Sequence, residues 1–200
     1  MRSIRVLLSF ILLTLATAVL AQQDVHKHPA DTPKVQTDAQ KSFAALKSLA
    51  GAWEGKVTLD TDAFGKPEDD TMKVNLRVTS RGNALVHEMG EFKPGADPTK
   101  YDHPVTMFYL DGDNLTLVHY CDAGNRPRMT ARTSEDGKKI EFDFLDLSGS
   151  NSHGHMGHAV FTMIDANHHI EEWTYMMPGD KPVHARADLQ RVSQQQASAR

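Results

Sequence analysis

The spacing of hydrophobic positions along the chain changes near Gly51. Between residues 38 and 50, the apolar side chains Phe43, Leu46 and Leu49 recur at three- and four-residue intervals. That spacing is typical of an amphipathic helix with one buried face. Beyond Gly51, apolar and polar residues alternate with a period of two, which indicates half-buried strands. The pattern therefore predicts one short helix followed by a long run of strands.

Ten segments with this alternation are separated by turn residues. They are Trp53–Leu59, Met72–Thr79, Ala84–Phe92, Val105–Leu110, Leu115–Cys121, Arg128–Thr133, Lys139–Leu147, His158–Ile164, His169–Met177 and Val183–Val192. No helix-length periodic segment interrupts them, so we expect neighbouring strands to pair antiparallel in an up-and-down order. Tight and longer connections alternate along the chain, and in such a meander alternate connections lie at the same end. The sequence thus predicts a cup whose tight turns form a closed end and whose longer loops surround an open end.

An even number of strands lets the last strand pair with the first and close the barrel. Closure places Arg191, near the end of the last strand, beside Trp53 at the start of the first. An arginine over an indole gives a cation–π contact of about 1 kcal/mol. The expected fold class is all-β: an up-and-down antiparallel β-barrel of about ten strands, with one short N-terminal helix at the closed end.

The segment Leu49-Ala50-Gly51-Ala52-Trp53-Glu54-Gly55 resembles the opening of lipocalin-like β-barrels of the calycin group. In layout, the chain from Phe43 to Val192 also resembles the ten-stranded haem barrels of nitrobindin type. The lipocalin resemblance implies a tryptophan plugging the closed end and a cavity for a small molecule. The nitrobindin resemblance implies haem held by one histidine near the open end, for which His119, His155 and His158 are candidates.

The two ends of the chain differ in composition from its centre. Arg2 and Arg5 precede the apolar run Val6–Leu20, and Val19-Leu20-Ala21 offers small residues at the usual cleavage positions, which is typical of a secretory signal. The expected organisation is a signal peptide over residues 1–21, a flexible linker over 22–36, the barrel over 37–192 and a disordered tail over 193–200. A periplasmic or secreted protein, with no stable membrane span after signal cleavage, follows from this interpretation; an uncleaved anchor is the alternative.

Charge and cysteine content limit the partners and the source of stability that the protein can have. The formal net charge is −4 and no basic stripe is evident, so nucleic acid is a poor candidate partner. Cys121 is the only cysteine, so no intramolecular disulfide can form. Stability must come from the packed core.

Residues with side chains suited to ligand binding or catalysis gather near the predicted open end. His119 lies on the strand face shared by Leu115 and Leu117 and points into the cavity if that face is the inner one. Arg128 starts the next strand, where it can bind a carboxylate or phosphate. With Asn125, His87, Trp173 and Tyr175, these residues form the predicted ligand-binding set. The alternative is a hydrogen-bonded loop anchor with exposed arginines.

The histidines His153, His155 and His158 suggest a transition-metal site, since neutral imidazole binds zinc, copper, nickel and iron. His155 and His158 differ by an odd step and point apart on a regular strand, so joint ligation requires the glycines between them to bend the chain. A solvated histidine loop is the alternative. The cofactor therefore stays open between none, a transition metal and haem.

Signals for catalysis are weaker. His119 and Cys121 resemble a nucleophile pair, but no helix start or oxyanion loop accompanies them. One of Glu171 and Glu172 must face inward, where it can act as a base with His87 or His119. We assign no catalytic residue.

The leading hypothesis is an exported barrel that binds a small, largely apolar or amphipathic molecule. The alternatives are a haem- or metal-binding barrel with redox or isomerase chemistry, and a solidly packed structural domain.

Overall fold

The computed structural model describes residues 35–60, 71–90, 95, 97 and 99–192. The predicted signal peptide and tail lie outside the described residues. The predicted linker does too, apart from residues 35 and 36.

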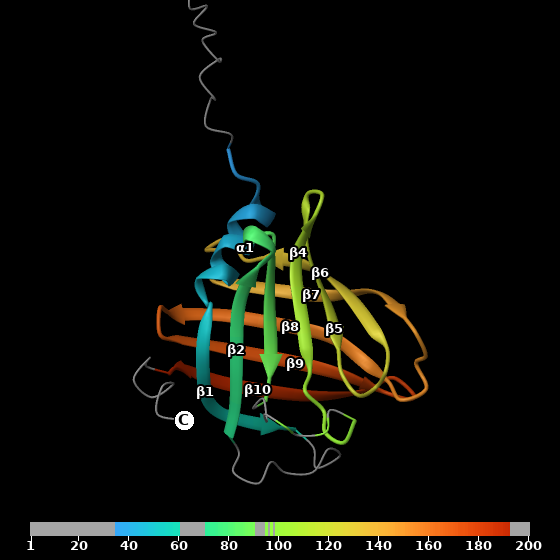
Figure 1. The fold of residues 1–200 in the computed structure, drawn as a ribbon. Coiled ribbons are helices and arrows are strands. Elements are labelled where there is room, and N and C mark those ends of the chain that lie inside the picture. Colours follow the sequence, from blue (N-terminus) through green and yellow to red (C-terminus); the bar gives the residue numbers. More distant parts are fainter. Residues whose placement is uncertain (1–34, 61–70, 91–94, 96, 98, 193–200) are drawn as a thin grey trace, which may run out of the picture. The chain divides into compact units, whose positions relative to one another are not determined.

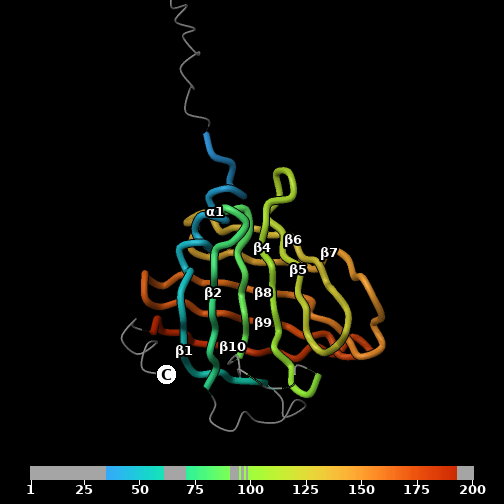
Figure 2. Tube along the Cα trace, viewed as in Figure 1, coloured from blue at the N-terminus to red at the C-terminus, as the bar shows by residue number. Residues whose placement is uncertain are grey.

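The described strands form one closed antiparallel barrel in which each strand pairs with its neighbours in sequence and the last pairs with the first. The strands are β1 (Gly51–Leu59), β2 (Thr71–Thr79), β3 (Ala84–Met89), β4 (Val105–Asp111), β5 (Asn114–Tyr120), β6 (Arg126–Thr133), β7 (Lys139–Ser148), β8 (His155–Asp165), β9 (His168–Met177) and β10 (Lys181–Arg191). In Figures 1 and 2, β1, β2 and β4 stand upright while β8 to β10 cross behind them. The predicted all-β, up-and-down barrel of ten strands is confirmed.

The helix α1 (Asp38–Ser48) precedes the first strand, as predicted, and packs against β2, β4, β5 and β6. Thr37 caps it by a reciprocal pair of hydrogen bonds with Gln40, which satisfies N–H groups that the first helical turn leaves without partners. Its apolar face buries Phe43 and Leu46 in the barrel core. The helix thus covers the closed end of the barrel (Figure 1).

The seam between β1 and β10 aligns Trp53 with Arg191, as the sequence predicts. The guanidinium of Arg191 lies 4.2 Å from the centre of the buried Trp53 ring system and donates hydrogen bonds to the carbonyls of Ala50 and Ser48. Gly51 has a φ of +140°, and a Cβ at this position would lie 2.5 Å from Nη1 of Arg191. The glycine of the Gly51-Ala52-Trp53 motif is therefore needed both for its backbone conformation and for the approach of Arg191.

Several strands begin one to three residues earlier than predicted, and the largest difference is in β8. β8 starts at His155 rather than His158, because a bulge between Met156 and His158 lets the strand continue with a changed register. Bulges add one residue to a strand and change which side chains face inward. Met156 consequently lies opposite the inward Tyr175, whereas His155 and His158 lie opposite Met176 and Thr174 of β9.

The closed half of the barrel is filled by apolar side chains. The phenyl rings of three fully buried residues pack there with centroids 5.4 to 6.1 Å apart: Phe108, Phe142 and Phe161. Leucines from β3 and β5 pack in the same cluster. This part of the barrel is a packed apolar core, and a cavity lies toward the other end. In the described part of the chain, no helix has the length and apolar character needed to cross a membrane.

Candidate functional site

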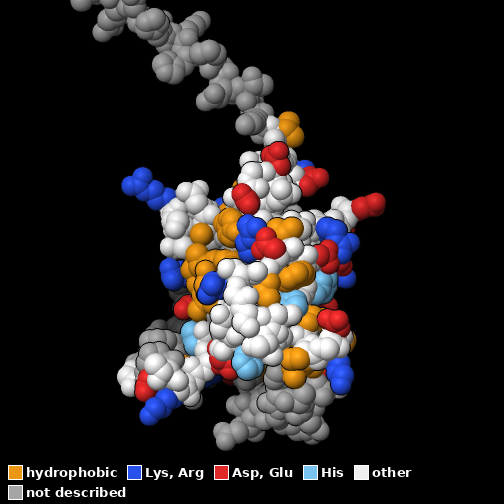
Figure 3. All heavy atoms as spheres, turned by 90° about the vertical axis from the view of Figure 1, so that its right-hand side faces the viewer, with side chains coloured by type: hydrophobic (Ala, Val, Ile, Leu, Met, Phe, Trp, Pro, Cys, Tyr) orange, Lys and Arg blue, Asp and Glu red, His pale blue; other side chains and the backbone are white. Residues whose placement is uncertain are grey.

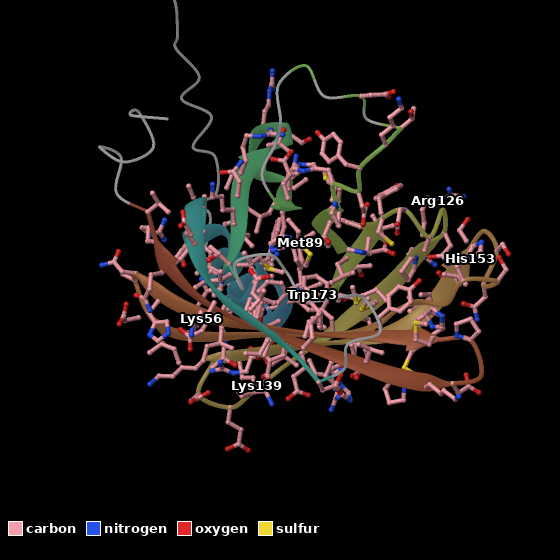
Figure 4. The ribbon with its side chains drawn as sticks, turned by 90° about the horizontal axis from the view of Figure 1, so that it is seen from below. Lys56, Met89, Arg126, Lys139, His153 and Trp173 are labelled. Atoms are coloured by element: carbon pink, nitrogen blue, oxygen red, sulfur yellow. The ribbon has the colours of Figure 1, made fainter. Side chains whose placement is uncertain are left out.

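A cavity of about 320 Å³ opens at the end of the barrel remote from α1. Its walls come from strand ends on both sides of the barrel. They are formed by Leu59, Met89, Asp102, Pro104, His119, Cys121, Asp122, Met156, Trp173, Tyr175, Val183 and Ala185. Viewed from below, Met89 and Trp173 lie near the centre of the ring of strands, whereas Lys56, Lys139, Arg126 and His153 lie toward its edge (Figure 4). Most of the wall is apolar, as in small-molecule sites generally.

A larger groove of about 570 Å³ lies between α1 and the turns that follow β4 and β6. Its buried hydroxyl group on Ser42 is already paired with Thr133, at 2.6 Å. The groove therefore presents no buried polar group in need of a partner. The barrel cavity is the stronger candidate site.

His119 supplies the buried polar group on the cavity wall. Its side chain is 1% exposed, and its Nδ1 lies 2.8 Å from the hydroxyl of Thr106 on β4. Its Nε2 is buried and has no hydrogen-bond partner in the structure. Burial, with a contribution from the nearby charge of His87, lowers the pKa of His119 to about 4. The imidazole is therefore neutral at physiological pH.

Deeper in the barrel, the carboxylate of Glu171 accepts three hydrogen bonds. Nε2 of His87 lies 2.9 Å from it, Nε2 of His169 lies 2.9 Å from it, and the indole N–H of Trp173 donates at 3.1 Å. Burial opposes ionisation of Glu171, but the charge of His87 and the hydrogen bonds from both histidines lower its pKa below its usual range. The carboxylate is ionised and holds the ring of Trp173, which forms part of the cavity wall.

The rim of the cavity carries acidic and aromatic groups. A carboxylate oxygen of Asp102 accepts the backbone N–H of Asp122 at 3.0 Å. Partial desolvation and the neighbouring Asp122 raise the pKa of Asp102. Burial, together with the charges of Cys121 and the two aspartates, raises the pKa of Tyr175. Burial likewise raises the pKa of the Cys121 thiol, which is unfavourable for a nucleophile at neutral pH.

The structure places three of the six predicted ligand-binding residues on the cavity wall: His119, Trp173 and Tyr175. His87 lies behind the wall, with its ring centroid 5.7 Å from that of Trp173. The remaining two have other partners. Asn125 is buried and donates to the carbonyls of Ser150 and Gly154, and so joins two loops.

Arg128 also lies away from the cavity. It forms a two-pronged ion pair with Asp146, its cross-strand partner on β7, and both side chains are substantially exposed. The inward residue at this level of β6 is Met129, which is fully buried. Strand alternation therefore directs Arg128 to the outer face, so it does not take the predicted place beside a ligand.

The three histidines of the predicted metal site do not converge. His155 hydrogen-bonds to Asn151 and packs against Phe144, and His158 contacts Asp143 at 3.2 Å, while His153 is exposed. Among the described residues, no group of three histidine, cysteine or acidic side chains is arranged to hold a metal ion. The face of the molecule in Figure 3 shows histidines dispersed among acidic, basic and apolar side chains.

The sequence reasoning did not identify the pairing of His169 with Glu171 or the role of Thr106. A signal for the first was present, because His169, Glu171 and Trp173 alternate on one face of a single strand. The contact of Glu171 with His87 joins residues 84 positions apart, so it depends on the register of the whole barrel.

Comparison of the coordinates with solved structures finds the same architecture elsewhere. The chain is similar to Rv2717c from M. tuberculosis, with a TM-score of 0.52 and 14% identity over 76% of this chain and 98% of that one. It also matches bovine odorant-binding protein, solved with a selenium-containing odorant, with a TM-score of 0.33 and 10% identity over 77% and 76% of the two chains. No protein-family model and no curated protein sequence matches the chain. The match to Rv2717c shows a shared fold, a closed antiparallel β-barrel, and the architecture that the sequence resemblance implies is confirmed.

Proposed function

We propose that the protein binds one small, largely apolar molecule in the barrel cavity. The observation that carries this proposal is a buried nitrogen without a partner on an otherwise apolar wall, the Nε2 of His119. A buried polar atom without a hydrogen bond costs about 1–3 kcal/mol, which a ligand with one suitably placed polar atom recovers. The apolar body of such a ligand gains about 25 cal/mol for each Å² removed from water.

The hydrogen bond between Thr106 and His119 indicates which polar atom suits the ligand. The Thr106 hydroxyl is fully buried, and among the described residues His119 Nδ1 is the hydrogen-bond partner found for it. The hydroxyl proton of Thr106 therefore forms a hydrogen bond only if Thr106 is the donor and Nδ1 of His119 the acceptor. The neutral imidazole then carries its own proton on Nε2 and donates into the cavity. A ligand with an uncharged acceptor, such as a hydroxyl, ether or carbonyl oxygen, matches this donor.

Titration with the neutral fluorophore N-phenyl-1-naphthylamine tests the proposal. The probe gains emission when it leaves water, and we expect saturation with one molecule per chain. Replacing Ala185 on the cavity wall by Trp fills the cavity and abolishes the signal. The matched control is Ala166→Trp in the exposed turn before β9. Equal binding by both variants, or none by the native protein, contradicts a ligand site in the barrel.

The proposed location of this binding protein is the periplasm or the exterior of the cell. Residues 1–21 support it through their basic start, apolar centre and small final residues. The intact mass of full-length chain expressed in a Gram-negative bacterium tests it. We expect a periplasmic product without the first 21 residues, and an unprocessed cytoplasmic product contradicts it.

Haem or metal binding is a second candidate, favoured by the same atom. In the tautomer whose proton lies on Nδ1 and is donated to Thr106, the buried Nε2 facing the cavity has the chemistry of an axial iron ligand, with Met89, Met156 and Trp173 as surrounding wall. Adding haemin to protein without a histidine tag is expected to shift the Soret band, and His119→Ala should remove the shift. An unshifted spectrum, with no metal in elemental analysis, excludes this candidate.

A further inference from the structure

The charges on the cavity wall are of one sign. Among the described lining residues, Asp102 and Asp122 are acidic and no lysine or arginine is present. Arg128, the predicted anion-binding residue, is held on the outer face by Asp146. A ligand carboxylate or phosphate at the rim thus meets repulsion from two aspartates and no described cation.

The two rim aspartates lie close together and beside an aromatic ring. Asp102 accepts the N–H of Asp122, and both carboxylates act on the phenol of Tyr175. The pKa of Asp102 is raised, so its ionised form is disfavoured in the absence of a positive charge. Carboxylates next to an aromatic face are a favourable environment for an ammonium group.

Below the rim, the wall has a different character. Met89, Val183 and Trp173 supply apolar surface, and Nε2 of His119 is the buried polar atom aimed into the same cavity. The site therefore combines an apolar interior and one hydrogen-bonding group with an acidic, aromatic opening.

We propose that the ligand is a cationic amphiphile, an apolar chain or ring system with an amine or quaternary ammonium group that lies at the Asp102–Asp122–Tyr175 rim. This inference rests on the proposed function and assigns a charge to the ligand of that site. The apolar part enters the cavity toward Trp173, and the cation remains partly hydrated at the opening. Because the aspartates are exposed, each makes only the modest contribution of a surface ion pair to the affinity.

Three ligands of equal chain length separate charge from apolar burial. Octylamine, octan-1-ol and octanoate are each used at pH 7.5 to displace N-phenyl-1-naphthylamine from the native protein. We expect octylamine to bind about fivefold more tightly than octan-1-ol, and octanoate to bind most weakly, as the sum of such ion-pair contributions implies. The preference for octylamine should decrease as salt is raised, because the rim charges are exposed.

Variants assign the effect to the rim. Asp102→Asn with Asp122→Asn should remove the difference in affinity between octylamine and octan-1-ol, while the acceptor for the Asp122 N–H is kept. The control is Asp146→Asn, which replaces an acidic residue on the outer face. It should change neither the affinity for octylamine nor the affinity for octan-1-ol. If octan-1-ol binds and octylamine binds no more tightly, the cationic ligand is refuted while the binding function stands. If no octyl compound displaces the probe, both proposals fail.

Discussion

The guanidinium of Arg191 lies over the indole of Trp53, with its central carbon 4.2 Å from the ring centroid. The two residues come from the last and first strands, so the contact joins the ends of the sheet at the seam of the barrel. Arg191 also donates to the Ala166 carbonyl in the turn before β9. One side chain thus connects the helix end, the first strand and a closing turn.

We expect Arg191→Ala to lower the free energy of unfolding by about 2–3 kcal/mol, because a cation–π contact and hydrogen bonds from a charged donor are lost together. Arg186→Ala, on the same strand but exposed and paired with Asp188, should change it by less than about 0.5 kcal/mol. Urea unfolding followed by circular dichroism measures both. Equal effects from the two variants are inconsistent with a specific role of Arg191 at the seam.

Substitution of the buried Glu171 should lower the free energy of unfolding more than the same substitution of its neighbour Glu172. Glu171→Gln replaces one carboxylate oxygen by an NH2 group, so a buried donor among His87, His169 and Trp173 loses its acceptor, which typically costs about 1–3 kcal/mol. The same change at the exposed Glu172 is the control and should cost under about 0.5 kcal/mol. Thermal unfolding distinguishes them, and an unchanged melting temperature for Glu171→Gln contradicts an ionised, hydrogen-bonded carboxylate.

Protonation of His119 should contribute to the pH dependence of stability. Its pKa is lowered from 6.5 to about 4 in the folded protein, so the unfolded chain takes up this proton first as the pH falls. The contribution of the neutral imidazole is complete above about pH 6.5 and is lost progressively toward pH 4.

Between pH 7.5 and pH 5, the native protein should therefore lose about 2 kcal/mol more unfolding free energy than His119→Gln, which does not titrate. Urea unfolding at the two pH values gives this difference. Identical losses in the two proteins would show that His119 is not held neutral by burial.

The fold was predictable from sequence because its signals are local and repeated. Alternation of period two, turn residues at regular spacing and the Gly51-Ala52-Trp53 motif all indicate the same barrel. Even the contact of Trp53 with Arg191 follows from an even strand count. Strand alternation could also have placed Arg128 outside, had the inner face of β6 been known.

The site was less predictable, because it depends on relationships between distant strands. The bulge at Gly157 determines that Met156 faces the cavity; a glycine within a strand is compatible with a bulge, but the residue alone does not fix the register that results. The sequence predicts that one of Glu171 and Glu172 faces inward with His87 or His119, but only the register of the closed barrel selects Glu171 and His87 as the pair. Clustering of histidines in sequence proved a poor guide, since His153, His155 and His158 have separate surroundings.

Methyl NMR of the protein labelled at its methionines, with N-phenyl-1-naphthylamine added, tests most directly whether the cavity is the binding site. Met89 and Met156 line the cavity, whereas Met129 is in the closed core and Met163 lies near the other end of β8. The account predicts that the ring current of the probe shifts the Met89 and Met156 methyl signals and leaves those of Met129 and Met163 in place. Saturable shifts at Met163 without shifts at Met89 and Met156 would contradict it.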